Sequence, residues 1–307
     1  MPKVHVNRSI QMDASPEKVY QLLSDFNNWT PWSPWLITEP DAKVTVSDDA
    51  KFYEWDGNRV GSGNMRIVGE KENSRIDLDL TFLKPWKSTA KVWFDIKAKG
   101  QGSEVSWGMD TSLPFIMFWM KKTMSAMIGM DYDRGLNMLK EFIEAGTVSS
   151  KLDFKGETQF DGCSYVGVKT SCSIQEVGSK MQADLARVGE FAQQNQDLEP
   201  GMVFSIYHKW DPVKGLVEYT SGISVKKLPG NLPAGLVSGE IPNTRIYSVE
   251  HHGAYHYLGN AWSALYNMQR SKVFKAKKGV HPFEIYHTDP HSTPDKEHVT
   301  SINFAVK

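Results

Sequence analysis

The chain has 307 residues, 40% of them hydrophobic and 23% charged, which is typical of a folded globular protein and more than one core usually holds. Lysine and arginine number 35 and aspartate and glutamate 36, so a formal net charge of −1 excludes a global attraction to nucleic acid or to an anionic membrane. The start, MPKVHVNRSIQMDA, lacks the apolar run of a signal peptide, and the longest apolar stretch, LPFIMFWM, is far shorter than the ~20 residues that span a bilayer. Cys163 and Cys172 lie nine residues apart and are not expected to pair, which favours a cytoplasmic location.

Tryptophan usage divides the chain into two parts. Eight of the ten tryptophans lie between Trp29 and Trp119. The small, polar segment EAGTVSSKLDFKGE, residues 144–157, separates this aromatic half from the remainder. Domain boundaries fall in exposed polar segments of this kind. We therefore predict a first domain over residues 1–147 and a second over residues 153–307.

The first half begins as strand, helix and then a run of strands. Residues 4–10 alternate between apolar and polar side chains, as in a half-buried strand. The segment SPE at 15–17 provides an N-cap serine, a proline at the first helical position and an acid in the first turn. Three further alternations, at 75–82, 91–98 and 105–109, predict antiparallel strands.

A long helix closes this half. It is expected to begin soon after Pro114, to carry an apolar side over 117–142 and to stop at Gly146. Residues 1–146 resemble the START-like helix-grip superfamily, often labelled polyketide cyclase-like or SRPBCC. The resemblance is carried by two segments, ASPEKVYQLLSDFNNWTPWSPW and MDYDRGLNMLKEFIEAG. The resemblance implies a curved antiparallel sheet that grips the long helix, with an apolar cavity between them.

Aromatic and methionine side chains are the candidate lining of that cavity. Methionine suits an adaptable apolar pocket. Trp93 is out of phase with Val92 and Phe94, so it faces the other side of its strand, which ordinary core packing does not explain. We take Trp93, Trp107 and Met120 as candidate ligand-binding residues, and ordinary core packing is the alternative for each.

The second half contains an internal duplication. The segment EVGSKMQADL from Glu176 matches YLGNAWSALY from Tyr257 at an offset of 81 residues. FSIYHKWDP matches FEIYHTDP at 79, and YTSGISV matches VTSINFAV at 80. Each copy reads as strand, helix, strand, strand, over about 160–226 and 243–307. Such a repeat indicates one pseudo-symmetric domain.

The second half resembles the GyrI-like small-molecule-binding domain, also called the AraC effector-binding domain. The resemblance is carried by the duplication and by the segments EHHGAYHYLGNAW, HPFEIYHTDP and TSINFAVK. The expected fold class is therefore α+β, with a helix-grip antiparallel sheet around a long C-terminal helix followed by a duplicated β-α-β-β domain. The resemblance implies helices on one face of a sheet and a ligand groove on the other. Family members bind bulky, often cationic or aromatic molecules, and the buried glutamate that serves the ligand in several of them corresponds to Glu284.

Strand alternation divides the repeated motif into two faces. Phe and Ile of FEIYH and FSIYH point one way, and we expect them against the helices, with His208 and His287 in structural roles. Glu284 and Tyr286 point the other way with Ser205 and Tyr207. A carboxylate among aromatic rings suits a ligand cation, and a buried, neutral acid that donates a hydrogen bond is the alternative. The candidate ligand-binding residues of this half are Glu284, Tyr286, Tyr207, Ser205, Trp210, Tyr255 and Trp262, with a solvated strand face the alternative for Glu284 and core packing for Trp262.

We expect a small-molecule-binding protein with no catalytic residue, cofactor or metal site, because no nucleophile–base pair, phosphate loop or metal-ligand spacing is evident. His251, His252 and His256 lie close in sequence beside Glu250 without such spacing. The expected partner is a small hydrophobic or cationic organic ligand, with neither nucleic acid nor membrane bound directly. Two enzymatic alternatives remain: hydrolysis of reactive organic toxins in the GyrI-like groove, and a cyclase or dehydratase reaction in the first domain. A protein partner, as in inhibitors of DNA gyrase, is a third reading.

Overall fold

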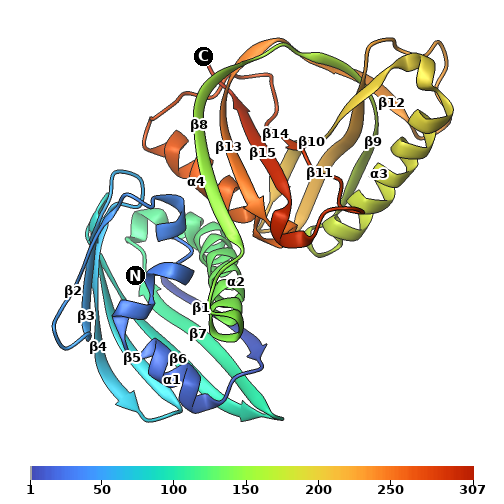
Figure 1. The fold of residues 1–307 in the computed structure, drawn as a ribbon. Helices are drawn as coiled ribbons and strands as arrows, with labels where there is room; N and C mark the ends of the chain where they lie inside the picture. The colour runs from blue at the N-terminus through green and yellow to red at the C-terminus, as the bar shows by residue number, and fades with distance from the viewer. Residues whose placement is uncertain (1) are drawn as a thin grey trace. The chain divides into compact units, whose positions relative to one another are not determined.

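A computed structural model describes residues 2–307 and divides into two compact units, the first ending at Ser149 and the second spanning Ser150–Lys307 (Figure 1). The first unit contains β1 (Lys3–Met12), α1 (Pro16–Leu23), three short 3₁₀ helices η1 (Phe26–Asn28), η2 (Thr30–Trp32) and η3 (Leu36–Thr38), β2 (Lys43–Val46), β3 (Phe52–Asp56), β4 (Ser62–Lys71), β5 (Arg75–Lys84), β6 (Ser88–Lys99), β7 (Gly102–Ser112), η4 (Phe115–Met120) and α2 (Lys121–Ala145). Its seven strands form one antiparallel sheet in the order β1-β7-β6-β5-β4-β3-β2.

Local sequence determines where the helices of this unit begin and end. The Ser15 side chain accepts a hydrogen bond from the Lys18 backbone N–H at 3.3 Å, and Pro16 begins α1, as predicted. At the other end of the unit, Gly146 caps α2 in the left-handed conformation, with φ of 77°. Helical structure begins at Phe115, soon after Pro114 as predicted, but it is interrupted at Met117. Met117 has non-helical φ and ψ of −105° and 17°, so residues 115–120 form the separate turn η4 and α2 begins at Lys121.

An aromatic stack holds α2 against the sheet. The Trp107 ring of β7 lies 4.0 Å from the Tyr132 ring of α2 at an interplanar angle of 12°, and it also stacks on Phe94 at 5.0 Å. Gly135, one turn beyond Tyr132, permits this approach, because a Cβ there would lie 2.7 Å from the Trp107 ring. The helix-grip arrangement is therefore built on close ring-to-helix packing.

The second unit contains β8 (Ser150–Phe160), β9 (Cys163–Ser173), η5 (Ile174–Glu176), α3 (Val177–Gln194), η6 (Gln196–Leu198), β10 (Pro200–Asp211), β11 (Leu216–Val225), β12 (Val237–Ile241), β13 (Thr244–Gly253), η7 (Tyr255–Tyr257), α4 (Gly259–Arg270), β14 (Phe283–Tyr286), η8 (Asp295–Glu297) and β15 (Val299–Ala305). The strand order of its sheet is β12-β9-β11-β10-β14-β15-β13-β8. The series β9-α3-β10-β11 is repeated as β13-α4-β14-β15, and the two series meet where β10 pairs with β14. The predicted α+β class and the duplicated β-α-β-β plan are thus confirmed.

This sheet is strongly curved. Only two residues join β8 to β9, yet these strands lie near opposite ends of the strand order. β12 and β13 are also joined by two residues and also lie near opposite ends. Figure 1 shows β8 arching over one end of the sheet to reach β9. The two short connections touch, since a Cβ on Gly162 (φ 79°) would lie 2.6 Å from the Asn243 backbone nitrogen. Curvature therefore brings both edges of the sheet together at this end.

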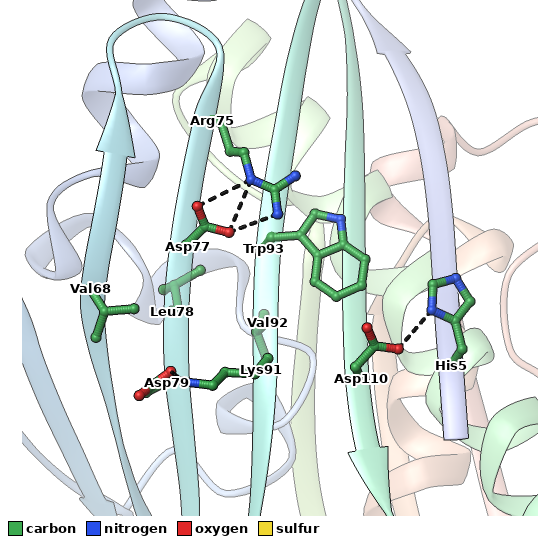
Figure 2. Close-up of a pocket in the computed structure, with 10 residues that line it drawn as sticks. All are labelled: His5, Val68, Arg75, Asp77, Leu78, Asp79, Lys91, Val92, Trp93 and Asp110. Atoms are coloured by element: carbon green, nitrogen blue, oxygen red, sulfur yellow. Dashed lines mark hydrogen bonds and ion pairs between the residues drawn. The ribbon is translucent and has the colours of Figure 1, made fainter. Parts of the chain in front are cut away.

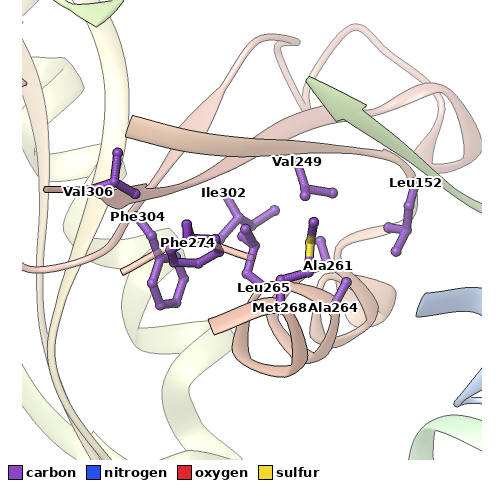
Figure 3. Packing of buried hydrophobic residues seen from close by; sticks show 10 residues of the cluster. All are labelled: Leu152, Val249, Ala261, Ala264, Leu265, Met268, Phe274, Ile302, Phe304 and Val306. Carbon is purple, nitrogen blue, oxygen red and sulfur yellow. The ribbon is translucent and has the colours of Figure 1, made fainter. Parts of the chain in front are cut away.

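The two helices of this unit pack on different halves of the sheet. α4 covers β8, β13 and β15 through a buried apolar cluster (Figure 3) consisting of Leu152, Val249, Ala261, Ala264, Leu265, Met268, Phe274, Ile302, Phe304 and Val306. α3 covers β9 and β11, with Val188 packed on Val166 and Val168. The central strands β10 and β14 lie between these two packed regions.

Candidate functional site

Glu284 lies at the centre of the second unit. Its strand, β14, is flanked by β10 and β15, and its side chain is 1% exposed. Glu284 pairs in register with Ile302, which belongs to the cluster beneath α4, so the carboxylate faces the side of the sheet that carries the helices. A buried acid at this position needs hydrogen-bond donors.

Three neutral donors reach the Glu284 carboxylate. Trp262 of α4 donates its indole N–H to Oε1 at 2.6 Å. The phenols of Tyr286 and Tyr207 donate to Oε2 at 2.7 Å and 3.0 Å. No lysine, arginine or histidine within residues 2–307 forms an ion pair or hydrogen bond with Glu284. The acid is thus hydrogen-bonded by aromatic side chains and has no protein counter-charge.

The residues around Glu284 come in repeat-related pairs. Tyr207 and Tyr286 are equivalent positions, as are Ser205 and Glu284. Met181 and Trp262 are equivalent at the offset of 81 residues found in the sequence. The three pairs converge, because the Tyr286 hydroxyl also contacts Met181 Sδ at 3.2 Å and the Trp262 ring lies 4.9 Å from the Tyr207 ring. The site therefore lies on the junction of the two repeats, between α3 and α4.

Burial dominates the electrostatics of this cluster. It raises the pKa of Glu284 above its ordinary value, and the hydrogen bonds from Trp262, Tyr286 and Tyr207 offset part of that rise. Burial also raises the pKa of Tyr207 and of Tyr286 well above 10, and the nearby Glu284 charge adds to the effect. Both phenols are therefore neutral donors at physiological pH.

The other predicted residues of this half lie at varying distances from the acid. Ser205 is buried beside Glu284, but its hydroxyl bonds to Ser221 Oγ at 2.8 Å. Trp210 is exposed, with its ring 6.1 Å from that of Tyr207. Tyr255 stacks on His298 at 4.4 Å and meets the Tyr286 ring edge-on at 5.8 Å. Tyr255 thus extends the aromatic cluster, whereas Trp210 marks its solvent side.

The predicted arrangement of the two faces is wrong. Phe283 and Phe204 do not face the helices. They pack with Tyr165, Ile241 and Ile246, which come from the outer strands of the curved sheet. Glu284 and Tyr286, predicted to face a helix-free groove, lie under α4 and α3 instead. Alternation predicted correctly which residues share a face, but curvature lets the sheet's own edges cover the other one.

In the first unit, Trp107 and Trp93 lie on opposite faces of the sheet and cannot line one cavity. Trp107 is buried in the aromatic stack against α2. Trp93 pairs with Gly108 and lies flat over it on the outer face, where a Cβ at Gly108 would be 2.1 Å from the indole. Trp93 lines a surface hollow of about 510 Å³. Figure 2 shows its ring between Arg75 and His5. Met120, at the end of η4, is partly exposed.

Two buried indole donors in the first unit have no acceptor. Within residues 2–307, neither Trp32 Nε1 nor Trp107 Nε1 has a hydrogen-bond partner, and their rings are 5.7 Å apart. Trp29 in the same cluster, by contrast, donates to the Leu23 carbonyl at 3.0 Å. An unsatisfied buried donor is uncommon in a folded protein, and a neighbouring pair is a notable feature of this core.

Comparison with known families accounts for both halves. Residues 3–144 match the family described as polyketide cyclase / dehydrase and lipid transport, and residues 158–307 match the GyrI-like small molecule binding domain. The chain is a fusion of these two families. Both predicted resemblances are confirmed, and the two domains indicate small-molecule binding.

Several solved structures are similar to parts of the chain. A cryo-EM structure of an EcmrR–DNA complex has 16% identity and a TM-score of 0.45, over 62% of this chain and 69% of that one. The C-terminal domain of EcmrR has 19% identity and a TM-score of 0.41, over 52% and 98% of the two chains. The Aha1 dimer from Colwellia psychrerythraea has 19% identity and a TM-score of 0.35, over 47% and 98%. No curated protein matches the chain.

Sequence reasoning missed two features of the GyrI-like domain. Met181, read only as part of an apolar helix face, contacts the Tyr286 phenol. Asp184, one turn further along α3, accepts hydrogen bonds from Tyr219 at 2.8 Å and Thr170 at 2.7 Å. The repeat alignment that equates Met181 with Trp262 contained the signal for the first feature, because equivalent residues of two packed repeats approach their common axis.

The histidines of the GyrI-like domain do not gather around one point. His251 is buried and bonds to Ser150 Oγ at 2.9 Å, and burial lowers its pKa to about 4. His252, with Asp153 and Glu250, presents donor atoms within 4.8 Å of one another. Lys155 lies 2.5 Å from Asp153 and 3.0 Å from Glu250 and offsets one of their two negative charges. His208 and His287 bond across the sheet to Thr220 at 2.7 Å and Ser301 at 2.9 Å, as structural residues do.

A second buried acid provides a contrast with Glu284. Glu39 of the first domain accepts hydrogen bonds from the backbone N–H groups of Asn58, Arg59 and Val60 at 2.7–2.8 Å, so it fixes a loop. The donors to Glu284, by contrast, are side chains from three different elements. None of the helices described over residues 2–307 combines the length and the apolar character that crossing a membrane requires.

Proposed function

We propose that the GyrI-like domain binds a bulky organic cation between α3 and α4, with Glu284 as its counter-charge. The observation that carries this proposal is a 1%-exposed carboxylate whose hydrogen-bond partners are all neutral. A buried charge without a partner is costly, and an incoming cation removes that cost. Tyr207, Tyr286 and Trp262 add aromatic faces for cation–π contact.

Access to Glu284 requires side-chain movement. Trp262 and Met181 come from the two helices, and both contact members of the cluster. When a ligand displaces the Trp262 indole, the carboxylate loses one neutral hydrogen bond and gains a full positive charge. Methionine and tryptophan side chains adapt to this role because neither is fixed by a backbone hydrogen bond here. Ligand binding is therefore expected to separate Trp262 from Glu284.

Replacing Glu284 by Gln tests the proposal. The probe is tetraphenylphosphonium, with triphenylphosphine oxide as a neutral control of similar shape. We expect Glu284→Gln to weaken cation binding roughly 30- to 100-fold, the equivalent of ~2–3 kcal/mol for a desolvated charge pair, and to change binding of the neutral compound less than about threefold. Equal effects on the two compounds would contradict the assignment. In the hydrolase alternative, the same variant loses turnover of a reactive substrate and retains most of its binding.

We propose that the first domain binds an apolar molecule that carries a hydrogen-bond acceptor. The unpaired donors Trp32 Nε1 and Trp107 Nε1 support this, since a carbonyl or similar group would satisfy them. Native mass spectrometry of the full chain purified from its host tests the proposal. A co-purifying acceptor-bearing molecule that is lost in Trp107→Phe is the expected result, and retention of the same molecule by Trp107→Phe would overturn it. The whole protein then holds small molecules for sensing, sequestration or delivery.

A further inference from the structure

Six large, exposed apolar side chains of the first domain lie at one end of its sheet. Four residues of η4 are between 60% and 81% exposed, and two residues at the β5–β6 turn are 43% and 52% exposed. We call this set the apolar end patch, and it consists of Leu83, Trp86, Phe115, Ile116, Phe118 and Trp119. Large apolar side chains at such exposure are unfavourable in water and mark interaction sites when they are grouped.

Strand register shows that the two parts of the patch are neighbours. β6 and β7 pair with Ala90 opposite Thr111, and the Thr111 hydroxyl donates to the Thr89 carbonyl at 2.7 Å. The β5–β6 turn and the exit of β7 into η4 therefore lie at the same end of the sheet, on adjacent strands about 5 Å apart. Two segments some thirty residues apart in sequence thus form one patch.

Lysines surround the patch. Lys84 and Lys87 flank Trp86, and Lys121 and Lys122 follow η4, all of them exposed. Segments 82–88 and 112–122 contain no acidic residue. Lys84 pairs with Asp56 at 3.4 Å, while the other three lysines have no ion pair within residues 2–307. Aromatic side chains bordered by lysines on protruding turns are typical of segments that enter the interface of an anionic bilayer.

We propose that the apolar end patch docks the protein on the surface of anionic lipid bilayers. The tryptophans and phenylalanines enter the boundary between headgroups and acyl chains, and the lysines contact the phosphate and carboxylate groups of the lipids. Net charge and segment length predicted no membrane contact, but both are properties of long stretches and do not detect a local patch built from two turns. This inference is independent of the site at Glu284.

Vesicle co-sedimentation of the full chain tests the proposal. The probe is phosphatidylcholine vesicles with about one part in three phosphatidylserine, compared with pure phosphatidylcholine. We expect the wild type to bind the neutral vesicles roughly tenfold more weakly than the anionic ones. Phe118→Ser/Trp119→Ser should bind the anionic vesicles roughly tenfold more weakly than the wild type does. Lys121→Glu/Lys122→Glu should lose about fivefold per lysine on the anionic vesicles alone. Val213→Ser/Leu228→Ser, which changes exposed apolar residues of the other domain, is the matched control and should bind as the wild type does.

Two outcomes would overturn the proposal. One is wild-type protein that does not sediment with anionic vesicles, or does so as well after Phe118→Ser/Trp119→Ser. The other is a wild-type dimer that the same double variant converts to a monomer, which would assign the patch to a second copy of the chain. Unfolding midpoints of all variants, measured alongside, distinguish these results from loss of the fold.

Discussion

Ser205 and Glu284 are Cα partners across the antiparallel β10–β14 pair, so the equivalent positions of the two repeats face each other. Paired residues in such a ladder have Cα atoms roughly 4.5–5.5 Å apart. Two carboxylates at this distance in a buried site repel each other. A single acid at the junction of a duplicated fold is therefore what the geometry permits, and this explains why only one copy of the motif contains glutamate.

Introducing the second acid tests this explanation. We expect Ser205→Glu to be less stable than Ser205→Gln by roughly 2–4 kcal/mol at pH 8, because the two variants differ only in a buried charge beside Glu284. The difference should shrink as pH falls and one carboxyl group becomes protonated. Urea unfolding of both variants at pH 8 and at a lower pH measures this difference in stability. Equal stability of the two variants at pH 8 would show that the paired positions do not interact.

The hydrogen bond between Trp262 and Glu284 should be strongly coupled. We expect Trp262→Phe to cost roughly 1.5–3 kcal/mol of unfolding free energy, since it removes a donor from a buried charged acceptor and retains an aromatic ring. In a Glu284→Gln background the same change should cost about 1 kcal/mol less. A double-mutant cycle by urea unfolding measures this coupling. Trp210→Phe is the control at an exposed position, and full additivity between Trp262 and Glu284 is the contradicting result.

Glu284 should make stability fall as pH rises. Burial raises the pKa of Glu284 above 4.5, so between that value and the folded-state pKa the folded protein binds more protons than the unfolded chain. The contribution of Glu284 is thus fully present below pH 4.5 and is lost as pH rises through its folded-state pKa. Unfolding free energies of wild type and Glu284→Gln, compared across this range, should diverge in favour of the variant at higher pH. Parallel curves would mean that the acid titrates normally.

The tryptophans of the first domain provide a matched pair. Trp107→Phe removes an indole N–H that has no acceptor, whereas Trp29→Phe removes one that donates to the Leu23 carbonyl. We expect the Trp29 variant to be less stable by roughly 1 kcal/mol or more than the Trp107 variant, because only Trp29→Phe leaves a buried carbonyl unpaired. Thermal unfolding of the ligand-free variants measures the difference. The reverse order would indicate that the Trp107 donor is satisfied in the protein.

Sequence alone predicted much of this architecture because its signals are local or repetitive. Alternation identified which residues join Glu284 on one face, and the repeat offset of 81 residues already equated Met181 with Trp262. Three-dimensional curvature, which no local pattern encodes, decided that the helices cover that same face. The packing of Trp107 against Gly135 of α2 is long-range, so no local pattern predicts it. Residues 115–120 follow Pro114 as the first turns of the long helix would, and no local sequence pattern marks the non-helical Met117 within them.

A crystal structure of the complex with tetraphenylphosphonium tests the central claim most directly, through the distance from the phosphorus atom to the Glu284 carboxylate. We predict that the cation lies between α3 and α4 within about 4–6 Å of that carboxylate, with the hydrogen bond from Trp262 Nε1 broken. A cation bound elsewhere, with all three hydrogen bonds to Glu284 intact, would contradict the account.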